Sequence, residues 1–231
     1  RTFGAPESRL ADALEDLPLP GDCEIAYRAS FPEVLITARI QQGAGAEDEG
    51  AAWLAEIRDR LAEWTYGDHP SEGLPHVVGD LLAGHDLTMA VAESCTGGLV
   101  SAALTDVPGA SRWFLEGAVT YANEAKMNRL GVSDSLLRAH GAVSEPVAIA
   151  MARGARDQSG ADIAVAITGI AGPGGGSPDK PVGTVHFAVS SDQGEVHLRR
   201  NYPYADRARN RRISTWQALD LLRIHLLRHH T

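Results

Sequence analysis

Residues 87–105 read LTMAVAESCTGGLVSAALT, a short apolar run that passes through a polar turn with two adjacent glycines into a helical pattern. The run predicts a buried strand over 87–92, and the pattern after the turn predicts a helix over 97–105. Further along, the sequence predicts a strand end at 118–121, a helix over 144–158 capped by Ser144, strands over 163–168, 182–189 and 195–200, and a last helix over 206–227. This alternation is typical of a layered α/β domain, in which ligands bind where strand ends meet helix starts.

Residues 1–73 show a different pattern and predict a separate, small α+β domain. An opening helix near 7–17 precedes two strands within 24–40, and residues 41–50 form a turn rich in glycine, alanine and acidic residues. The helix that follows has an apolar face made by Trp53, Ile57, Leu61 and Trp64. The expected fold class is therefore α/β, with a layered domain over 74–231 after a small α+β domain over 1–73.

The formal net charge of −9 is concentrated at the amino-terminal end of this 231-residue chain. Residues 1–75 carry six arginines against fifteen acidic residues, whereas the remainder is balanced. So acidic a segment repels phosphate backbones, which argues against nucleic-acid binding. The region from Arg199 onward is rich in arginine and suits small phosphorylated ligands.

Composition disfavours several further classes of protein. With 44% hydrophobic and 22% charged residues the chain is typical of soluble proteins, and the absence of a membrane-length apolar run or export signal predicts a cytoplasmic location. Cys23 and Cys95 lack paired metal-ligand spacing, so reduced thiols are expected. His225, His229 and His230 recur at helical spacing, but a helix dipole favours histidines in its last turn without a metal. Neither a metal nor a cofactor is expected.

Two segments suggest a nucleophile and a base. Ser94 lies at the mouth of the turn after the first strand, where it is either a nucleophile or a helix cap. Only two of the 21 basic side chains are lysines, and an amine can lose its proton whereas a guanidinium cannot. Lys126 is therefore a candidate base, although a solvated lysine is the commoner role of this residue type. Because no Ser-x-x-Lys spacing follows Ser94, the pair must be assembled in space.

The neighbouring residues leave alternatives open. Tyr121 either orients the Lys126 amine or relays its proton, or it is a core tyrosine with a satisfied hydroxyl. Cys95 is an alternative thiol nucleophile, ranked below Ser94 because no histidine stands in a neighbouring motif to activate it. Lys180 either contacts substrate or pairs with Asp179.

The stretch 168–177, TGIAGPGGGS, ends an apolar strand in a loop that can approach a ligand closely. It is not a Walker A sequence, and a dinucleotide fingerprint starting at Gly172 fails at Ser177. Two interpretations of this loop remain: its backbone amides bind a phosphate, or it binds no ligand.

Six ordered segments together resemble the carboxy-terminal domain of the CinA family of competence- and damage-inducible proteins. These segments are AVAESCTGG, VPGAS, VTYANEAKMNRLGV, GAVSE, TGIAGPGGG and KPVGTV. Residues 1–73 resemble the family's KH-like domain but lack the Gly-x-x-Gly loop that clamps nucleic acid. The resemblance also implies that the pyrophosphatase-type domain that precedes these two in full-length members is absent from this sequence.

The resemblance implies a homodimeric nicotinamide-nucleotide amidase that converts nicotinamide mononucleotide to nicotinate mononucleotide and ammonia. Ser94 matches the family's nucleophile, Tyr121 its tyrosine and Lys126 its lysine, and backbone amides within 94–98 are expected to stabilise the oxyanion. The residues expected to contact substrate are Cys95, Thr96, Gly97, Gly98, Thr168, Gly169, Ala171, Gly172 and Arg207, with Arg211 as a further phosphate candidate. A non-catalytic module that binds a phosphorylated metabolite and a hydrolase based on Cys95 are the alternatives.

Overall fold

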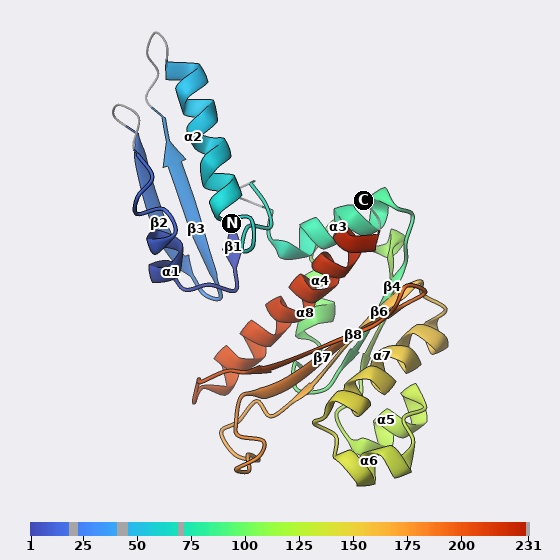
Figure 1. Ribbon diagram of the computed structural model, residues 1–231. Helices are drawn as coiled ribbons and strands as arrows, with labels where there is room; N and C mark the ends of the chain where they lie inside the picture. Colours follow the sequence, from blue (N-terminus) through green and yellow to red (C-terminus); the bar gives the residue numbers. More distant parts are fainter. Residues whose placement is uncertain (19–22, 41–45, 69–71, 230–231) are drawn as a thin grey trace. The chain divides into compact units, whose positions relative to one another are not determined.

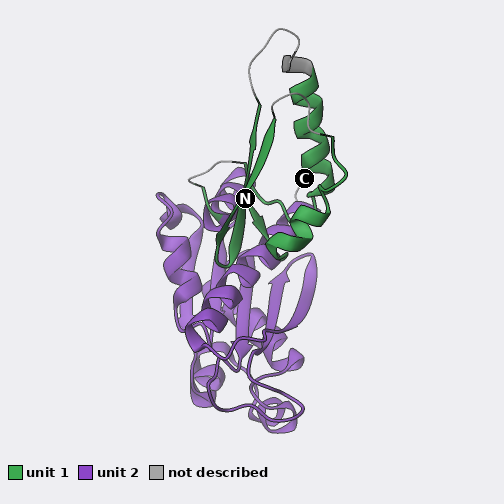
Figure 2. Cartoon of the chain, turned by 90° about the vertical axis from the view of Figure 1, so that its left-hand side faces the viewer, with its two compact units in different colours: residues 1–73 green, residues 74–231 purple. Residues whose placement is uncertain are grey.

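The computed structural model describes residues 1–18, 23–40, 46–68 and 72–229. The chain divides into two compact units, Arg1–Gly73 and Leu74–Thr231, which Figure 2 shows in separate colours; Figure 1 labels their helices and strands. Part of the turn predicted over 41–50 and His230 lie outside the described residues. Of the described helices, none combines the length and apolar character that a membrane crossing requires.

The first unit is a three-stranded antiparallel sheet with two helices. Its elements are β1 (Thr2–Phe3), α1 (Glu7–Asp12), β2 (Glu24–Ser30), β3 (Glu33–Arg39) and α2 (Ala46–Arg60), and the strand order is β1-β3-β2. Trp53, Ile57 and Leu61 are buried on one face of α2 and its extension, where they share a core with Leu10 and Val34. The helix predicted near 7–17 is shorter than expected, because turns replace it after Asp12.

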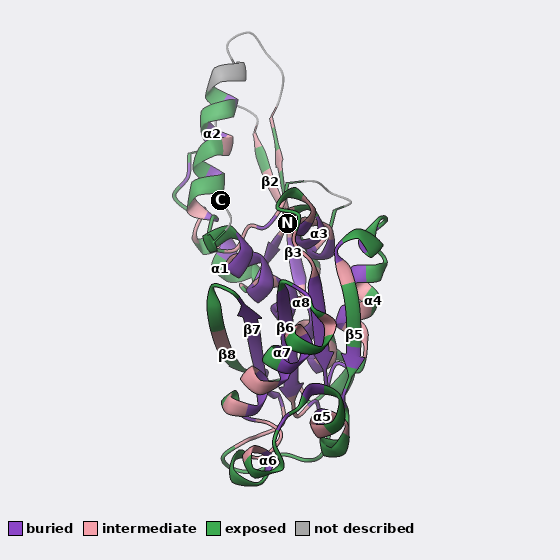
Figure 3. Ribbon diagram, turned by 90° about the vertical axis from the view of Figure 1, so that its right-hand side faces the viewer, coloured by how far each residue is buried: buried purple, intermediate pink, exposed green. Residues whose placement is uncertain are grey.

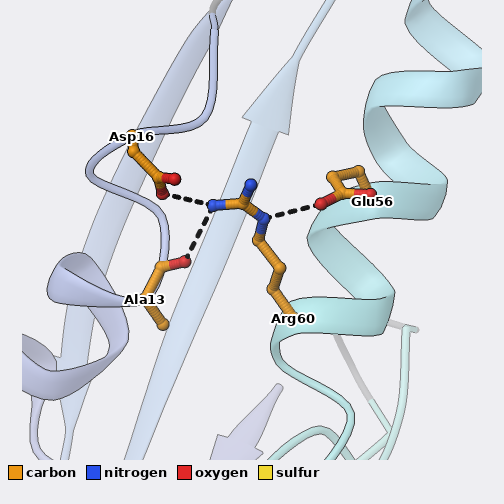
Figure 4. A network of polar contacts seen from close by, with 4 residues as sticks. All are labelled: Ala13, Asp16, Glu56 and Arg60. Atoms are coloured by element: carbon orange, nitrogen blue, oxygen red, sulfur yellow. Dashed lines mark hydrogen bonds and ion pairs between the residues drawn. The ribbon is translucent and has the colours of Figure 1, made fainter.

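Arg60, at the end of α2, joins that helix to the turns after α1 (Figure 4). Its guanidinium donates to the Ala13 carbonyl and the Asp16 carboxylate, and its Nε donates to Glu56. Because solvent screens exposed ion pairs, the shared apolar core is the main source of the unit's stability.

The second unit is a five-stranded mixed sheet with helices on both faces. Its strands are β4 (Met89–Glu93), β5 (Phe114–Val119), β6 (Ile163–Gly169), β7 (Thr184–Ser191) and β8 (Gly194–Asn201), in the order β5-β4-β6-β7-β8. Strands β5, β4 and β6 run parallel to one another. Strand β7 pairs antiparallel with β6, and β8 pairs antiparallel with β7. Helix α7 (Glu145–Ser159) covers one face, and α3 (Leu74–Gly84), α4 (Leu99–Thr105) and α8 (Arg207–His229) lie on the other (Figure 1).

Burial follows from this arrangement. Strand β7 is buried along its whole length and β6 almost so, whereas the edge strand β8 is largely exposed (Figure 3). Strands covered by helices on both faces have no solvent side, which explains the continuous apolar run over 163–168. The observed fold confirms the predicted class, an α/β unit that follows a small α+β unit.

Short helices complete the second unit between β4 and α7. They are the 3₁₀ helix η1 (Ala110–Arg112), α5 (Asn123–Leu130) and α6 (Asp134–His140). Gly154 allows α7 to approach the end of α5, since a Cβ atom there would lie 1.9 Å from the Leu130 carbonyl oxygen. Ser144 occupies the cap position of α7 as predicted, but its hydroxyl donates to the Gly141 carbonyl at 2.8 Å and caps no helix amide.

Candidate active site

The three segments singled out in the sequence meet at one edge of the second unit's sheet. Strands β5, β4 and β6 are parallel neighbours, and their pairing places Glu93 beside Val119 and Ile167. The pairing continues past the strand ends, because the Ser94 amide donates to the Ile167 carbonyl at 2.9 Å and the Thr120 amide donates to the Glu93 carbonyl at 2.8 Å. Ser94 therefore follows β4, the middle one of the three parallel strands, and lies between the ends of its two neighbours, the edge at which α/β sheets bind ligands.

Lys126, in the first turns of α5, reaches into that edge. The residue is only 1% exposed, and its Nζ lies 3.1 Å from Ser94 Oγ. It also donates to the carbonyls of Thr120 at 2.7 Å and Tyr121 at 3.3 Å. Burial lowers the pKa of the Lys126 amine because the charged form loses its hydration, and a smaller opposing effect comes from Cys95. The structure thus brings together the serine and the lysine that spacing alone could not pair.

The hydroxyl of Tyr121 contacts Arg207, the first residue of α8. Arg207 Nη2 donates to the Tyr121 hydroxyl at 2.8 Å, and Nη1 donates to the Gly172 carbonyl at 2.9 Å. Tyr121 is 58% exposed, which excludes the core tyrosine considered from the sequence. Its hydrogen bond with Lys126 is made by the main-chain carbonyl.

The Glu93 side chain, at the end of β4, lies at the amino-terminal end of α4. This fully buried carboxylate accepts hydrogen bonds from the amides of Gly98, Val100 and Ser101 at 2.8, 3.2 and 2.9 Å, and from the Ser101 hydroxyl at 2.7 Å. A negative charge at this position complements the helix dipole and satisfies amides that would otherwise attract an anionic ligand.

The Ser94 turn, residues 94–98, is consequently less available to a ligand than the sequence suggests. Besides the Gly98 amide held by Glu93, the Gly97 amide donates to the Ser94 carbonyl at 3.1 Å. This corrects the expectation that the amides of Gly97 and Gly98 face the reacting group.

A pocket of about 270 Å³ opens beside Ser94 and Lys126. Its lining residues come from the ends of β4 and β6, the turn before α7, the glycine loop (residues 169–176) and the starts of α5 and α8: Ser94, Cys95, Tyr121, Lys126, Ala142, Val143, Thr168, Gly169, Ile170, Ala171, Gly172, Gly174, Gly175 and Arg207. Of the residues expected to contact substrate, Thr96, Gly97 and Gly98 are not part of this lining. The lining contains the permanently charged guanidinium of Arg207 and no carboxylate, which favours an anionic ligand.

Thr168 and Lys180 have structural partners. The Thr168 hydroxyl donates to the Ala142 carbonyl at 2.8 Å, which holds the turn before α7 against the end of β6. Lys180 Nζ donates to the His140 carbonyl at 2.8 Å and lies outside the pocket lining. Two roles were considered for Lys180, a contact with substrate and an ion pair with Asp179. Its observed partner is instead the His140 carbonyl, outside the pocket.

Cys95 lines the pocket but is poorly suited to be a nucleophile. It is 4% exposed, and burial raises the pKa of its thiol to about 12. Since the thiolate is the reactive species, a thiol with such a pKa is inert at neutral pH.

Two residues near the site had no role in the sequence analysis. Asn210 is fully buried, and its Nδ2 donates to the carbonyls of Ala171 at 3.0 Å and Tyr204 at 2.9 Å. Nothing local marks Asn210, because Ala171 lies 39 residues away. Glu93 did have a signal, since a carboxylate just before a glycine turn and a helix start is placed to accept the first helix amides.

Fold and site together define a class: a small α+β unit followed by a layered α/β unit that carries a buried serine–lysine pair at the ends of parallel strands. The sequence matches the family models of the CinA C-terminal domain over residues 71–226 and the damage-inducible protein CinA KH domain over residues 1–67. The chain belongs to the CinA family, which confirms the resemblance drawn from the six ordered segments.

Individual relatives agree with this assignment. The CinA-like proteins of Citrifermentans bemidjiense and Anaeromyxobacter sp. (strain K) are 43% and 46% identical to the chain over 98% of its length. These alignments cover 54% and 55% of the relatives, so the chain spans about half the length of the curated relatives it matches.

Solved structures are similar as well. The competence/damage inducible protein CihA from Agrobacterium tumefaciens is 41% identical with a TM-score of 0.64, and covers 69% of this chain and 99% of its own. A CinA superfamily protein from Escherichia coli is 32% identical with a TM-score of 0.64, and covers 71% of this chain and 95% of its own.

Proposed function

We propose that this chain hydrolyses the carboxamide of nicotinamide mononucleotide to give nicotinate mononucleotide and ammonia. The observation that carries the proposal is the 3.1 Å separation of Lys126 Nζ and Ser94 Oγ at a pocket without carboxylates. The choice of substrate rests on the family resemblance. The Arg207 guanidinium in the pocket lining suits a ligand with a phosphate group.

The surroundings of Lys126 suit a neutral amine. A neutral amine has two N–H donors and one lone pair, and the carbonyls of Thr120 and Tyr121 account for the two donors. The lone pair then meets the Ser94 hydroxyl, which donates its proton to the amine as the oxygen attacks. Burial acts in the same direction, because it lowers the pKa of Lys126.

The reaction follows in two steps. Ser94 Oγ bonds to the carboxamide carbon while its proton moves to Lys126, and the protonated amine then delivers that proton to the departing nitrogen as the C–N bond breaks. Ammonia leaves, and the nicotinate is held as an ester of Ser94. A water molecule attacks the ester and gives one proton to Lys126, which returns it to Ser94 as the acyl–oxygen bond breaks; the carboxylic acid formed releases its other proton to solvent and departs as nicotinate mononucleotide.

The oxyanion formed during each step needs donors near Ser94. Glu93 holds the Gly98 amide and the Ser94 carbonyl holds the Gly97 amide, which leaves the amides of Cys95 and Thr96 within the turn. We assign these two N–H groups to the oxyanion in place of Gly97 and Gly98. Each such donor contributes about 3 kcal/mol to transition-state stabilisation in comparable enzymes.

Arg207 and Tyr121 are assigned to substrate binding at the mouth of the pocket. Two guanidinium donors of Arg207 are engaged by Tyr121 and Gly172, and a guanidinium has five donors in total. The remaining donors suit a phosphate. Tyr121 orients this guanidinium in addition to supplying its carbonyl to Lys126.

The proposal is tested by incubating the purified chain with nicotinamide mononucleotide and measuring ammonia. We expect steady release that Ser94→Ala abolishes and that Cys95→Ala leaves within about a factor of three of the unmodified chain. Binding without release would support the non-catalytic module instead. Loss of release in Cys95→Ala alone would support the thiol hydrolase.

A further inference from the structure

The first turns of α8 hold the glycine loop by its main-chain carbonyls. Arg207 donates to the Gly172 carbonyl, and the buried Asn210 donates to the Ala171 carbonyl. The two side chains are three residues apart and so lie on one face of the helix. This face fixes the glycine loop relative to α8.

Arg211, one helical turn after Arg207 on the same face of α8, contacts the Ser94 turn. Its guanidinium donates to the Thr96 carbonyl through Nη2 at 2.7 Å and Nε at 3.3 Å. Gly97 makes this approach possible, since it adopts a left-handed φ of 59° and a Cβ atom there would lie 3.3 Å from Arg211 Nη2. The Ser94 turn is therefore held from two sides, by Glu93 through its amides and by Arg211 through a carbonyl.

We propose that Arg211 is a positioning residue for Ser94. By holding the Thr96 carbonyl it keeps the turn where the Ser94 hydroxyl meets Lys126, and through α8 it sets the distance between this turn and the glycine loop. As regards substrate, the inference rests on the proposed amidase function. The positioning role replaces the expectation that Arg211 binds phosphate. The Arg211 guanidinium is engaged with the main chain, and Arg211 is not part of the pocket lining.

The physical reason is the loss of a charge-assisted donor. Bonds from a guanidinium to a carbonyl are shorter and stronger than neutral ones, and Thr96 is fully buried. Without Arg211 the Thr96–Gly97 peptide loses this anchor and the turn gains freedom. A small displacement of a nucleophile from its base is enough to slow an attack substantially.

The test compares Arg211→Gln with Arg212→Gln, a neighbouring exposed arginine that lies over the Trp216 ring. Two quantities are measured: the rate at which a neutral fluorophosphonate labels Ser94, and kcat and KM for nicotinamide mononucleotide and for its phosphate-free riboside. We expect Arg211→Gln to lower labelling and both kcat values about ten-fold with KM changed less than about two-fold, and Arg212→Gln to behave as the unmodified chain. Arg211→Lys, which retains a charged donor, should recover part of the loss.

Unchanged labelling and kcat in Arg211→Gln would overturn the proposal. A rise in KM for the mononucleotide alone would overturn it in favour of a phosphate contact. If Arg211→Gln fails to fold, the labelling rate of Arg211→Lys decides, with an unchanged rate counting against positioning. Labelling of Ser94 without ammonia release would refute the amidase, and the labelling rate of Arg211→Gln then decides the positioning role. Ammonia release without labelling would leave the amidase standing, and the kcat of Arg211→Gln then decides the positioning role.

Discussion

Lys126 Nζ lies 3.1 Å from Ser94 Oγ although the two residues are 32 positions apart in the chain. Parallel pairing of β4 and β5 brings Thr120 beside Glu93, and α5 then turns the lysine back over the end of β4. Gly154 contributes from a distance, because its lack of a side chain lets α7 pack against the end of α5. The geometry of the pair thus depends on the packing of β4, β5, α5 and α7.

The first prediction concerns the chemical identity of the base. Replacing Lys126 by arginine puts a permanently charged side chain where the mechanism needs a neutral amine, so kcat should fall by about 10²- to 10⁴-fold. Lys180→Arg is the matched control, since that lysine donates to a carbonyl outside the pocket and should retain full activity. An Lys126→Arg variant with most of its activity would rule out proton transfer to the amine.

A second prediction concerns Glu93 and stability. Glu93→Ala leaves three buried or partly buried amides without their acceptor, and we expect the free energy of unfolding to fall by about 2–4 kcal/mol. Glu116, an exposed residue of β5, provides the control, and Glu116→Ala should be nearly neutral. Urea denaturation of both variants measures the difference, and equal midpoints would show that Glu93 contributes little to the turn.

A third prediction concerns stability at acidic pH. His186 Nδ1 lies 2.9 Å from His197 Nε2, and burial together with this neighbouring ring lowers the pKa of His186 from 6.5 to about 4. Between these values the unfolded chain binds a proton that the folded chain does not, so stability falls as pH decreases from 6.5 towards 4.

Through His186, the unmodified chain should lose up to about 2 kcal/mol of unfolding free energy between pH 7 and pH 5. His186→Asn should lack this part of the loss. Denaturation at the two pH values measures this difference, and His140→Gln, at an exposed histidine, should leave it unchanged. The same acid sensitivity in His186→Asn would place its origin elsewhere.

Sequence patterns were sufficient for the fold class and most strands. The apolar run over 163–168 and the alternation within 24–40 predict β6, β2 and β3 because burial dictates those patterns directly. The helix α6 was not predicted, since seven residues are too few for a clear periodicity.

The site was only partly readable from sequence. Ser94 and Lys126 could be named as candidates, but their meeting depends on strand pairing and on the return of α5. The roles of Glu93 and Arg211 depend on where main-chain groups point, which periodicity does not reveal. The same limit explains Ser144, whose position was predicted correctly and whose hydrogen bond was not.

The central claim, proton transfer from Ser94 to a neutral Lys126, is tested most directly by the pH dependence of kcat/KM for nicotinamide mononucleotide. Because the neutral amine is the active form and burial lowers its pKa, activity should rise with pH to a plateau, with a midpoint clearly below the ordinary lysine value of 10.5. A rate that does not rise with pH, or that rises only with a midpoint at 10.5 or above, would contradict the account.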